Sequence, residues 1–265
     1  MDIAVLVKAS LDTNMLRIDS SGRLLIDETP LVISEYDRNA VEEAVRIKEE
    51  KGGKVVAFSV LTWGPIQRKV GDAENALREA LAMGADEAHL VVDESIIPGS
   101  VDTTVEVLKA LIEKFGPFDL VISGEASMDM LSFQVAARLA EKLNYSLVTF
   151  VRKLEVLDGK IRATRDLEEA LEIVEADLPA VISVTGEINQ PRLPTLLMIR
   201  KSFAKPLNKY SLADIGLAEL AAKIKVKDIS LVTITRKNIM IEAESLEEIA
   251  DQLIEKLLSE GVIKG

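Results

Sequence analysis

The chain has 265 residues, of which 48% are apolar and 29% are charged, a balance that excludes a disordered protein. That length fits one sizeable α/β domain with extensions, or at most two small domains. The formal net charge is −12, and no basic stripe with interleaved aromatic residues offsets it, so a nucleic-acid partner is not expected.

Cysteine is absent from the sequence, which excludes disulfides, thiolate catalysis and cysteine-ligated metals. No apolar run approaches the roughly 18–20 residues that cross a bilayer, so no transmembrane segment is expected. The first eight residues lack the basic start and the cleavage site of a signal peptide and are typical of a strand. We therefore expect a cytoplasmic protein.

Short, nearly continuous apolar runs alternate with helical patterns over the first two-thirds of the chain. Such runs are typical of parallel strands that are covered on both faces. The expected strands are Ile3–Val7, Val55–Leu61, Ala88–Val92, Leu120–Ser123 and Leu147–Val151. The expected helices are Glu35–Glu50, Ala73–Met83, Thr103–Lys114 and Leu131–Leu143. The predicted fold class is α/β, with an open, mostly parallel sheet and helices on both faces.

Local signals add detail between the first strand and the first helix. Arg17–Asp19 and Leu24–Asp27 are expected to form a small hairpin around a Ser-Gly turn. Ser34–Asp37 matches a capping box, in which the serine hydroxyl accepts a backbone N–H and an acid follows three residues later.

The pattern changes after Val151. Leu154–Leu157 and Lys160–Thr164 predict a hairpin, an acidic stretch follows, and Pro179–Val184 predicts a last strand of the main sheet. We therefore divide the chain into an α/β domain over residues 1–185 and an extended C-terminal arm over residues 186–265.

The arm ends in an amphipathic helix, Leu246–Leu258, that follows a second capping box at Ser245–Glu248. Its apolar stripe must be buried on the chain's own sheet or on a partner. The sequence pattern leaves both possibilities open.

The residues for acid–base or metal chemistry are largely missing. His89, the only histidine, lies inside an expected buried strand and is interpreted as a core residue rather than a general base. Paired-histidine metal motifs, a nucleophile elbow, a P-loop and a G-x-G-x-x-G fingerprint are all absent from the sequence. No catalytic residue and no metal site is assigned, and a binding function remains.

One loop, residues 124–135, has the features of a phosphate site. It follows an expected strand and opens a helix, and ligands of open α/β sheets bind beyond the carboxyl ends of the strands. Gly124 permits a sharp exit, while Ser132 and Gln134 supply side-chain donors beside the backbone N–H groups. The alternative is an ordinary strand-to-helix loop in which Asp129 caps the helix.

Two further strand ends are expected at the same edge of the sheet. Ser59, Val60 and Trp63 follow another strand, where the indole could shield a ligand or could simply pack. Ala9, just after the first strand, completes a line of strand ends on which an adenosine could lie.

Several separate blocks then occur in a recognisable order and spacing. They are Asn39–Ala44, Leu77–Asp86, the 124–135 loop, signature residues within 164–182, and Glu187–Leu196. By these blocks the chain resembles the beta subunit of electron-transfer flavoproteins over nearly its whole length. It departs from the family pattern at Ala170, Ser183, Phe133 and the segment Lys8–Asp12.

The resemblance implies a Rossmann-like fold and a heterodimer with a larger alpha subunit, which carries most of the FAD site. Residues 1–185 would be the nucleotide-binding domain, and the arm with its terminal helix would pack on the alpha subunit. The chain would be an electron carrier rather than an enzyme. It would work between an acyl-CoA-type or other dehydrogenase and a quinone reductase or ferredoxin-type acceptor. Leu196 would anchor the loop that docks the dehydrogenase, although it could instead pack within the helix that follows.

The resemblance also implies a second adenine-nucleotide site in this chain. In one branch of the family this site holds AMP, and in the electron-bifurcating branch it holds a second FAD. Ile33–Asn39 and Glu172–Glu175 are closer to the bifurcating branch, so we expect FAD rather than AMP. The residues expected at the site are Ala9, Ser34, Ser59, Val60, Trp63, Gly124, Asp129, Ser132, Phe133, Gln134 and Val135.

Two other classes of protein were weighed. A stand-alone adenine-nucleotide-binding protein of the universal-stress type shares the alternating pattern but does not explain the long arm. A nucleotidyl-transferring enzyme would need histidines or lysines beside the phosphates, and the expected helix ends do not supply them.

Overall fold

The computed structural model describes residues 1–218, 220, 223–224, 226–227, 229–230 and 236–264. The chain forms two compact units, Met1–Ser230 and Leu231–Gly265, which we describe separately. Within the described residues, no helix has the length and apolar character that would let it cross a membrane.

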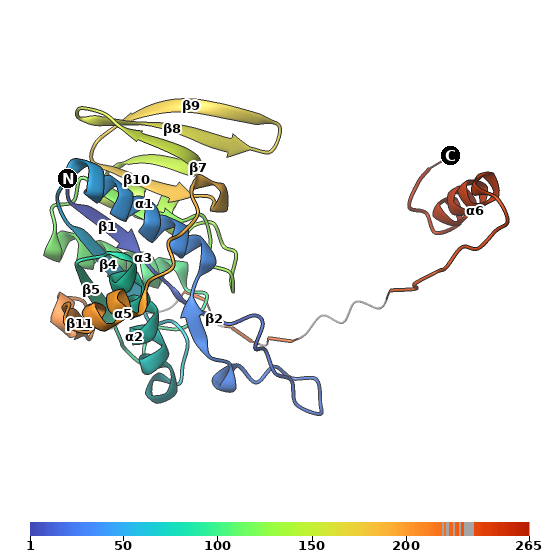
Figure 1. Ribbon diagram of the computed structural model, residues 1–265. Helices are drawn as coiled ribbons and strands as arrows, with labels where there is room; N and C mark the ends of the chain where they lie inside the picture. The colour runs from blue at the N-terminus through green and yellow to red at the C-terminus, as the bar shows by residue number, and fades with distance from the viewer. Residues whose placement is uncertain (219, 221–222, 225, 228, 231–235, 265) are drawn as a thin grey trace. The chain divides into compact units, whose positions relative to one another are not determined.

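A nine-stranded sheet forms the centre of the first unit (Figure 1). Its strand order is β11-β5-β4-β1-β6-β10-β7-β8-β9. The seven strands from β11 to β7 run parallel, and β8 and β9 add an antiparallel edge. The strands are β1 Ile3–Leu6, β4 Val55–Val60, β5 Glu87–Val91, β6 Leu120–Gly124, β7 Ser146–Val156, β8 Lys160–Leu167, β9 Ala170–Asp177, β10 Ala180–Val184 and β11 Leu207–Tyr210.

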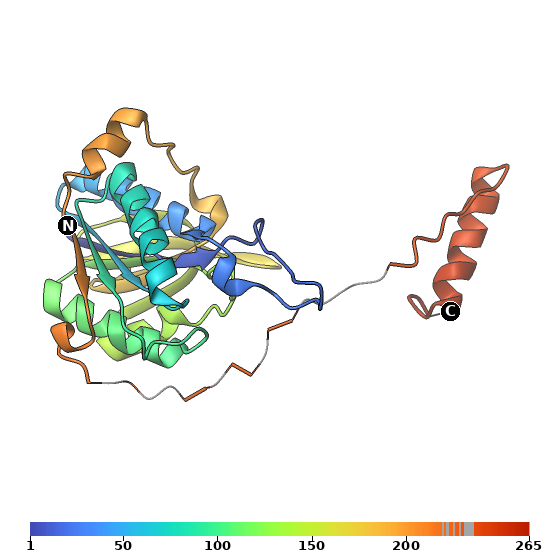
Figure 2. The same cartoon turned by 90° about the horizontal axis from the view of Figure 1, so that it is seen from below.

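Helices cover both faces of this sheet, as the sequence predicts. The helices are α1 Glu35–Lys51, α2 Ile66–Met83, α3 Val101–Phe115, α4 Val135–Leu143 and α5 Leu196–Ser202. Strand side chains alternate between the faces, so Ile3 and Val5 join the core under α1 and α2, whereas Ala4 and Leu6 join the core under α3 and α4. Figure 2 shows the two helix layers, with the blue and teal helices on one side of the sheet and the green helices on the other.

The strand order changes direction at β1. The chain first adds β4 and β5 on one side of β1 and then places β6 on the other side. Connections leave in opposite directions at such a point, and this opens a crevice beyond the carboxyl ends of the strands. The crevice is where a ligand site is expected.

Two helix starts differ from the prediction. α2 begins at Ile66 rather than Ala73, and α4 begins at Val135 rather than Leu131. Leu131 and Phe133 have positive φ angles of 45° and 55°, which no α-helix accommodates, so this part of the loop stays irregular.

The capping box expected before α1 is wrong at the level of side chains. Ser34 is the N-cap residue, but its hydroxyl makes no cap hydrogen bond. It accepts instead from the backbone N–H of Met128, at 3.4 Å, and so connects the start of α1 to the loop after β6.

The segment before α1, residues 12–30, also differs in part from the prediction. Its expected hairpin forms in part: Ile18 bridges Leu24, and the N–H groups of Asp19 and Leu25 donate to the carbonyl oxygens of Arg23 and Arg17. Its second arm does not continue, because Ile26–Glu28 is a 3-10 helix, η1. The two ends of this segment are joined by a small antiparallel sheet of β2 (Ala9–Leu11) and β3 (Leu31–Ile33). This pairing joins residues at least twenty positions apart, which local patterns do not reveal.

The hairpin expected after Val151 is confirmed, but its first strand is one continuous β7. The acidic stretch that follows is strand β9, which the prediction missed. Its acids pair with Lys160, Arg162 and Arg165 of β8, while Val174 and Ala176 pack against the core.

Residues 186–230 belong to the same compact unit as the sheet. After the 3-10 helix η2 (Gly186–Ile188), α5 packs against α2, and β11 pairs in parallel with β5. A third 3-10 helix, η3, covers Ala213–Ile215.

The second unit contains α6, Leu246–Ser259. Its N-cap is confirmed, since the Ser245 hydroxyl accepts from the backbone N–H of Glu248 at 3.2 Å. Apolar side chains on α6 stay exposed within the described residues, including Leu246 at 84% and Ile254 at 50%. The packing of this helix on a partner remains a prediction.

His89 is a core residue, as predicted. Its ring stacks on Phe115 at 3.9 Å and on Phe58 at 5.3 Å, measured between ring centroids. Burial lowers the pKa of His89 to about 4, so the imidazole is neutral near pH 7.

Candidate functional site

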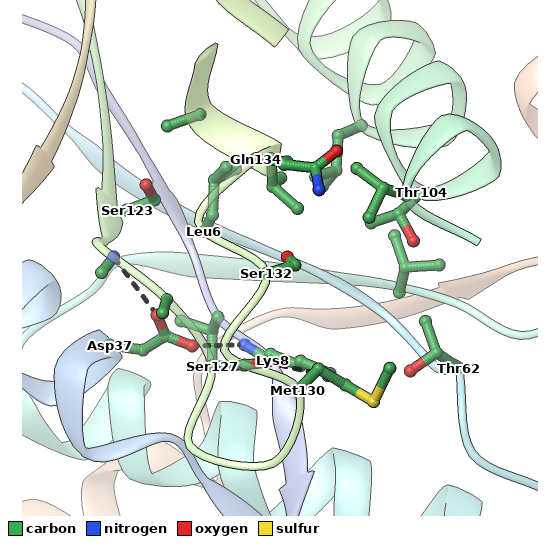
Figure 3. Close-up of a pocket in the computed structure, with 18 of the residues that line it drawn as sticks. Leu6, Lys8, Asp37, Thr62, Thr104, Ser123, Ser127, Met130, Ser132 and Gln134 are labelled. Carbon is green, nitrogen blue, oxygen red and sulfur yellow. Dashed lines mark hydrogen bonds between the residues drawn. The ribbon is translucent and has the colours of Figure 1, made fainter. Parts of the chain in front are cut away.

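A cavity opens where the carboxyl ends of β1, β4 and β6 meet (Figure 3). The cavity volume is about 130 Å³, and the space counted out to the open mouth is about 880 Å³. The polar residues that line it are Lys8, Asp37, Ser59, Thr62, Ser100, Thr104, Ser123, Glu125, Ser127, Ser132 and Gln134.

Two helices begin at this cavity. Gly99, Ser100 and Val101 line it at the start of α3, and residues 132–136 line it at the start of α4. The first N–H groups of a helix have no partner within the helix, and the helix dipole makes this end positive. The cavity therefore favours an anionic group.

Two buried hydroxyl groups in the cavity lack a partner. Ser59 is 1% exposed and Ser123 is 5% exposed, and the Oγ of each makes no hydrogen bond within the described part of the chain. A buried polar atom without a partner costs free energy, and most such atoms are satisfied in proteins. A polar ligand between β4 and β6 would provide the missing partner.

The loop after β6 is held by one carboxylate, that of Asp129. Its Oδ1 accepts from Lys8 Nζ at 2.6 Å, and its Oδ2 accepts from Trp63 Nε1 at 2.7 Å and from the backbone N–H of Leu11 at 3.1 Å. Lys8 Nζ also donates to Ser127 Oγ at 3.1 Å. Because the Lys8 charge is paired with Asp129, the helix N-termini supply most of the positive potential in the cavity.

Gly124 is required by a close approach to α1. A Cβ atom at this position would lie 2.6 Å from Tyr36 Cβ and 2.7 Å from Asp37 Oδ1. The Gly124 N–H donates to that same Asp37 oxygen at 3.3 Å. Because Gly124 has no side chain, the end of β6 can pack closely against the start of α1.

Asp37 is a buried carboxyl at the edge of the cavity. Burial raises the pKa of Asp37 to about 7, although the N–H groups of Lys8 and Gly124 and the Lys8 charge oppose the rise. Burial, together with Glu187 and Asp166, also raises the pKa of Glu125. Asp37 is therefore partly neutral near pH 7 and repels an anion less strongly than an ordinary carboxylate would.

The structure brings most of the predicted site residues together. Seven of them line the cavity: Ser59, Val60, Gly124, Ser132, Phe133, Gln134 and Val135. The other four, Ala9, Ser34, Trp63 and Asp129, lie outside the lining. Ala9 belongs to β2, and Ser34 contacts the backbone of the 124–135 loop. Asp129 does not cap α4, because the N-cap residue is Gln134.

The predicted site did not include eight other polar residues of the lining, one of which is Glu125 in the loop after β6. Lys8, Thr62 and Ser123 stand at or just after the ends of β1, β4 and β6, so the strand-end rule that selected Ser59 could have found them. Asp37, Ser100, Thr104 and Ser127 come from helix starts and from the loop interior, and only the folded chain brings them to the cavity.

Leu196 lies away from the cavity, at the start of α5, and is 82% exposed. The neighbouring Leu193 and Leu197 are 92% and 59% exposed. These side chains form an apolar surface that is not covered by the described residues. The docking role of Leu196 stays a prediction.

The fold and the cavity together define an α/β protein with an open cavity at the switch point of its sheet. The family model of the electron transfer flavoprotein domain matches residues 23–215 of the chain. The chain belongs to the family of electron-transfer flavoprotein beta subunits.

Individual relatives agree with this assignment over their full length. The electron transfer flavoprotein subunit beta of Thermoanaerobacterium thermosaccharolyticum is 37% identical over 269 residues, which cover 99% of this chain and 100% of the relative. The subunit beta of Bacillus subtilis is 32% identical, with the same coverage. The caffeyl-CoA reductase-Etf complex subunit CarD of Acetobacterium woodii is also 32% identical, with 99% and 100% covered.

Proposed function

We propose that the chain pairs with a larger alpha subunit and that FAD, shared between the two subunits, carries electrons from a dehydrogenase to a downstream acceptor. The full-length relatives named as electron transfer flavoprotein beta subunits support this role. Bound flavin supplies one- and two-electron transfer, while the protein sets its orientation and potential. The chain is then an electron carrier and not an enzyme by itself.

We further propose that the cavity beyond β1, β4 and β6 holds an adenine nucleotide. The observation that carries this proposal is the pair of buried hydroxyls, Ser59 and Ser123, which find no partner among the described residues and lie in a cavity between two helix N-termini. Ser132 and Gln134, with the first N–H groups of α4, would hold the phosphate. Ser59 and Val60 would face the nucleoside.

The expected nucleotide in this cavity is FAD rather than AMP. The segments Ile33–Asn39 and Glu172–Glu175 support this choice, because they resemble the electron-bifurcating branch of the family. A relative named as a subunit of a caffeyl-CoA reductase–Etf complex also supports it. The chain would then take part in flavin-based electron bifurcation.

The proposed partners follow from the same family. The electron donor is an acyl-CoA-type or other dehydrogenase, and the acceptor is a quinone reductase or a ferredoxin-type protein. Leu196, exposed at the start of α5, would enter a pocket of the dehydrogenase, as buried apolar anchors commonly do. The C-terminal arm, residues 186–265, with the exposed apolar side chains of α6, would pack on the alpha subunit in the cytoplasm.

Co-expression with the alpha subunit tests the proposal. The assembled pair should be yellow, and denaturing it should release two FAD per heterodimer. One FAD and one AMP would keep the electron carrier but place the protein in the other branch. An assembled pair that releases neither flavin nor AMP would refute the proposed function.

A further inference from the structure

Asp129 joins three segments that are far apart in the sequence. Lys8 follows β1, Leu11 ends β2, and Trp63 follows β4, yet each donates a hydrogen bond to the same carboxylate. These bonds tie the loop after β6 to the segments that follow β1 and β4 of the main sheet, and to β2 of the small sheet. One side chain thus connects every strand end that forms the cavity.

The carboxylate of Asp129 is almost completely enclosed. Its side chain is 1% exposed, whereas the Lys8 side chain is 23% exposed. Burial alone would raise the pKa of Asp129, but the Lys8 charge and the hydrogen bonds from Lys8 and Trp63 hold it below its ordinary value. Breaking a buried ion pair by removing one partner leaves the other charge uncompensated, which is costly.

The loop that Asp129 holds has a strained backbone. Leu131 and Phe133 follow it by two and four residues and adopt left-handed φ angles of 45° and 55°. Such conformations persist only where the surrounding structure holds them in place. Both residues precede Gln134 and Val135, which line the cavity at the start of α4.

We propose that Asp129 is a positioning residue, which fixes the 124–135 loop for nucleotide binding without contacting the nucleotide. Trp63 is its hydrogen-bond donor and not a stacking surface for the ligand, since neither residue lines the cavity. This inference rests on the proposed nucleotide site. Asp129, an acidic residue of the loop, would then support the site rather than bind the ligand.

The variants Asp129→Ala and Asp129→Asn test the role in the purified full chain. AMP and FAD are the probes, and affinity is measured by calorimetry and by the emission of Trp63, the only tryptophan of the chain. Asp129→Ala should weaken nucleotide binding by about tenfold or more, because hydrogen bonds to a charged group are lost. Asp129→Asn keeps an acceptor for Trp63 or Leu11 but loses the charge, so its effect should be smaller.

Asp86→Asn is the matched control. Asp86 also pairs with a lysine, Lys48, and accepts from the backbone N–H of Val55, but it lies at the opposite end of the sheet. It should leave nucleotide affinity unchanged. Hydrogen exchange adds a second readout: Asp129→Ala should speed exchange of residues 125–134, and Asp86→Asn should not.

The outcomes separate the two proposals. If Asp129→Ala is folded and keeps both the wild-type affinity and the wild-type exchange of the loop, the positioning role is wrong. If that variant does not fold, Asp129→Asn and Trp63→Phe decide: weakened binding in either supports the role, and wild-type affinity in both overturns it. If the wild-type chain binds neither AMP nor FAD, the proposed nucleotide site fails, while the exchange of residues 125–134 still decides whether Asp129 fixes the loop.

Discussion

Replacement of Gly124 by alanine should empty the cavity and spare the flavin that is shared with the alpha subunit. The new Cβ would lie 2.6 Å from Tyr36 Cβ, whereas carbon atoms in contact prefer about 3.5–4.0 Å. Either the end of β6 or the start of α1 must therefore move by about 1 Å. The Gly124 N–H donates to Asp37 across this contact, so that hydrogen bond is lost or lengthened as well.

A displacement of this size should weaken the hydrogen bonds that the loop makes to the nucleotide, so affinity should fall by about tenfold or more. The overpacking itself should cost about 1–3 kcal/mol of folding free energy. The assay is the number of adenine nucleotides released per assembled heterodimer, together with the dissociation constant for added nucleotide. Gly186→Ala is the control, because no atom lies within 4 Å of a Cβ at that position.

Wild-type nucleotide content and affinity in a folded Gly124→Ala complex would refute the reasoning. Loss of all flavin together with the second nucleotide would show a different error. The 124–135 loop would then support the shared flavin site as well as the cavity.

Three further predictions concern other parts of the chain. Leu196→Ala should slow electron transfer from the dehydrogenase without changing the flavin content. Leu16→Ala, at a second exposed leucine, should leave the rate unchanged. Equal rates in wild type and Leu196→Ala would rule out the docking role. Because the folded-state pKa of Asp37 is raised to about 7, the contribution of Asp37 to stability falls as pH rises from its unfolded-state pKa toward 7. Denaturant unfolding from pH 5 to 8 should therefore show the wild type losing stability relative to Asp37→Asn. Parallel pH curves for the two proteins would argue against the raised pKa. Arg192→Ala should lower the free energy of unfolding by about 2 kcal/mol, because the buried Glu42 loses its main cationic partner, and an unchanged denaturation midpoint would contradict this.

The sheet and its crevice could be predicted because their signals are local. The apolar runs of β1, β4, β5, β6 and β10 are long enough to be recognised without tertiary information. Once their order along the chain is known, the strand-end rule locates Ser59, Val60 and Gly124 at the cavity.

The details that failed depend on contacts between distant segments. The 124–135 loop follows no local pattern, because its path is fixed by bonds from Lys8, Leu11 and Trp63 to Asp129. β9 was missed because its sequence is rich in acids, whose cross-strand partners on β8 are revealed only by the folded chain. β11 is a four-residue edge strand that forms only because β5 offers a free edge.

The direct test of the central claim is a crystal structure of the chain assembled with its alpha subunit. The account predicts an adenine nucleotide in the cavity between β4 and β6, with its phosphate at the first turn of α4 and with Ser59 and Ser123 hydrogen-bonded to it or to its bound water. A cavity filled by side chains of either subunit, with both hydroxyls satisfied by protein atoms, would contradict the account.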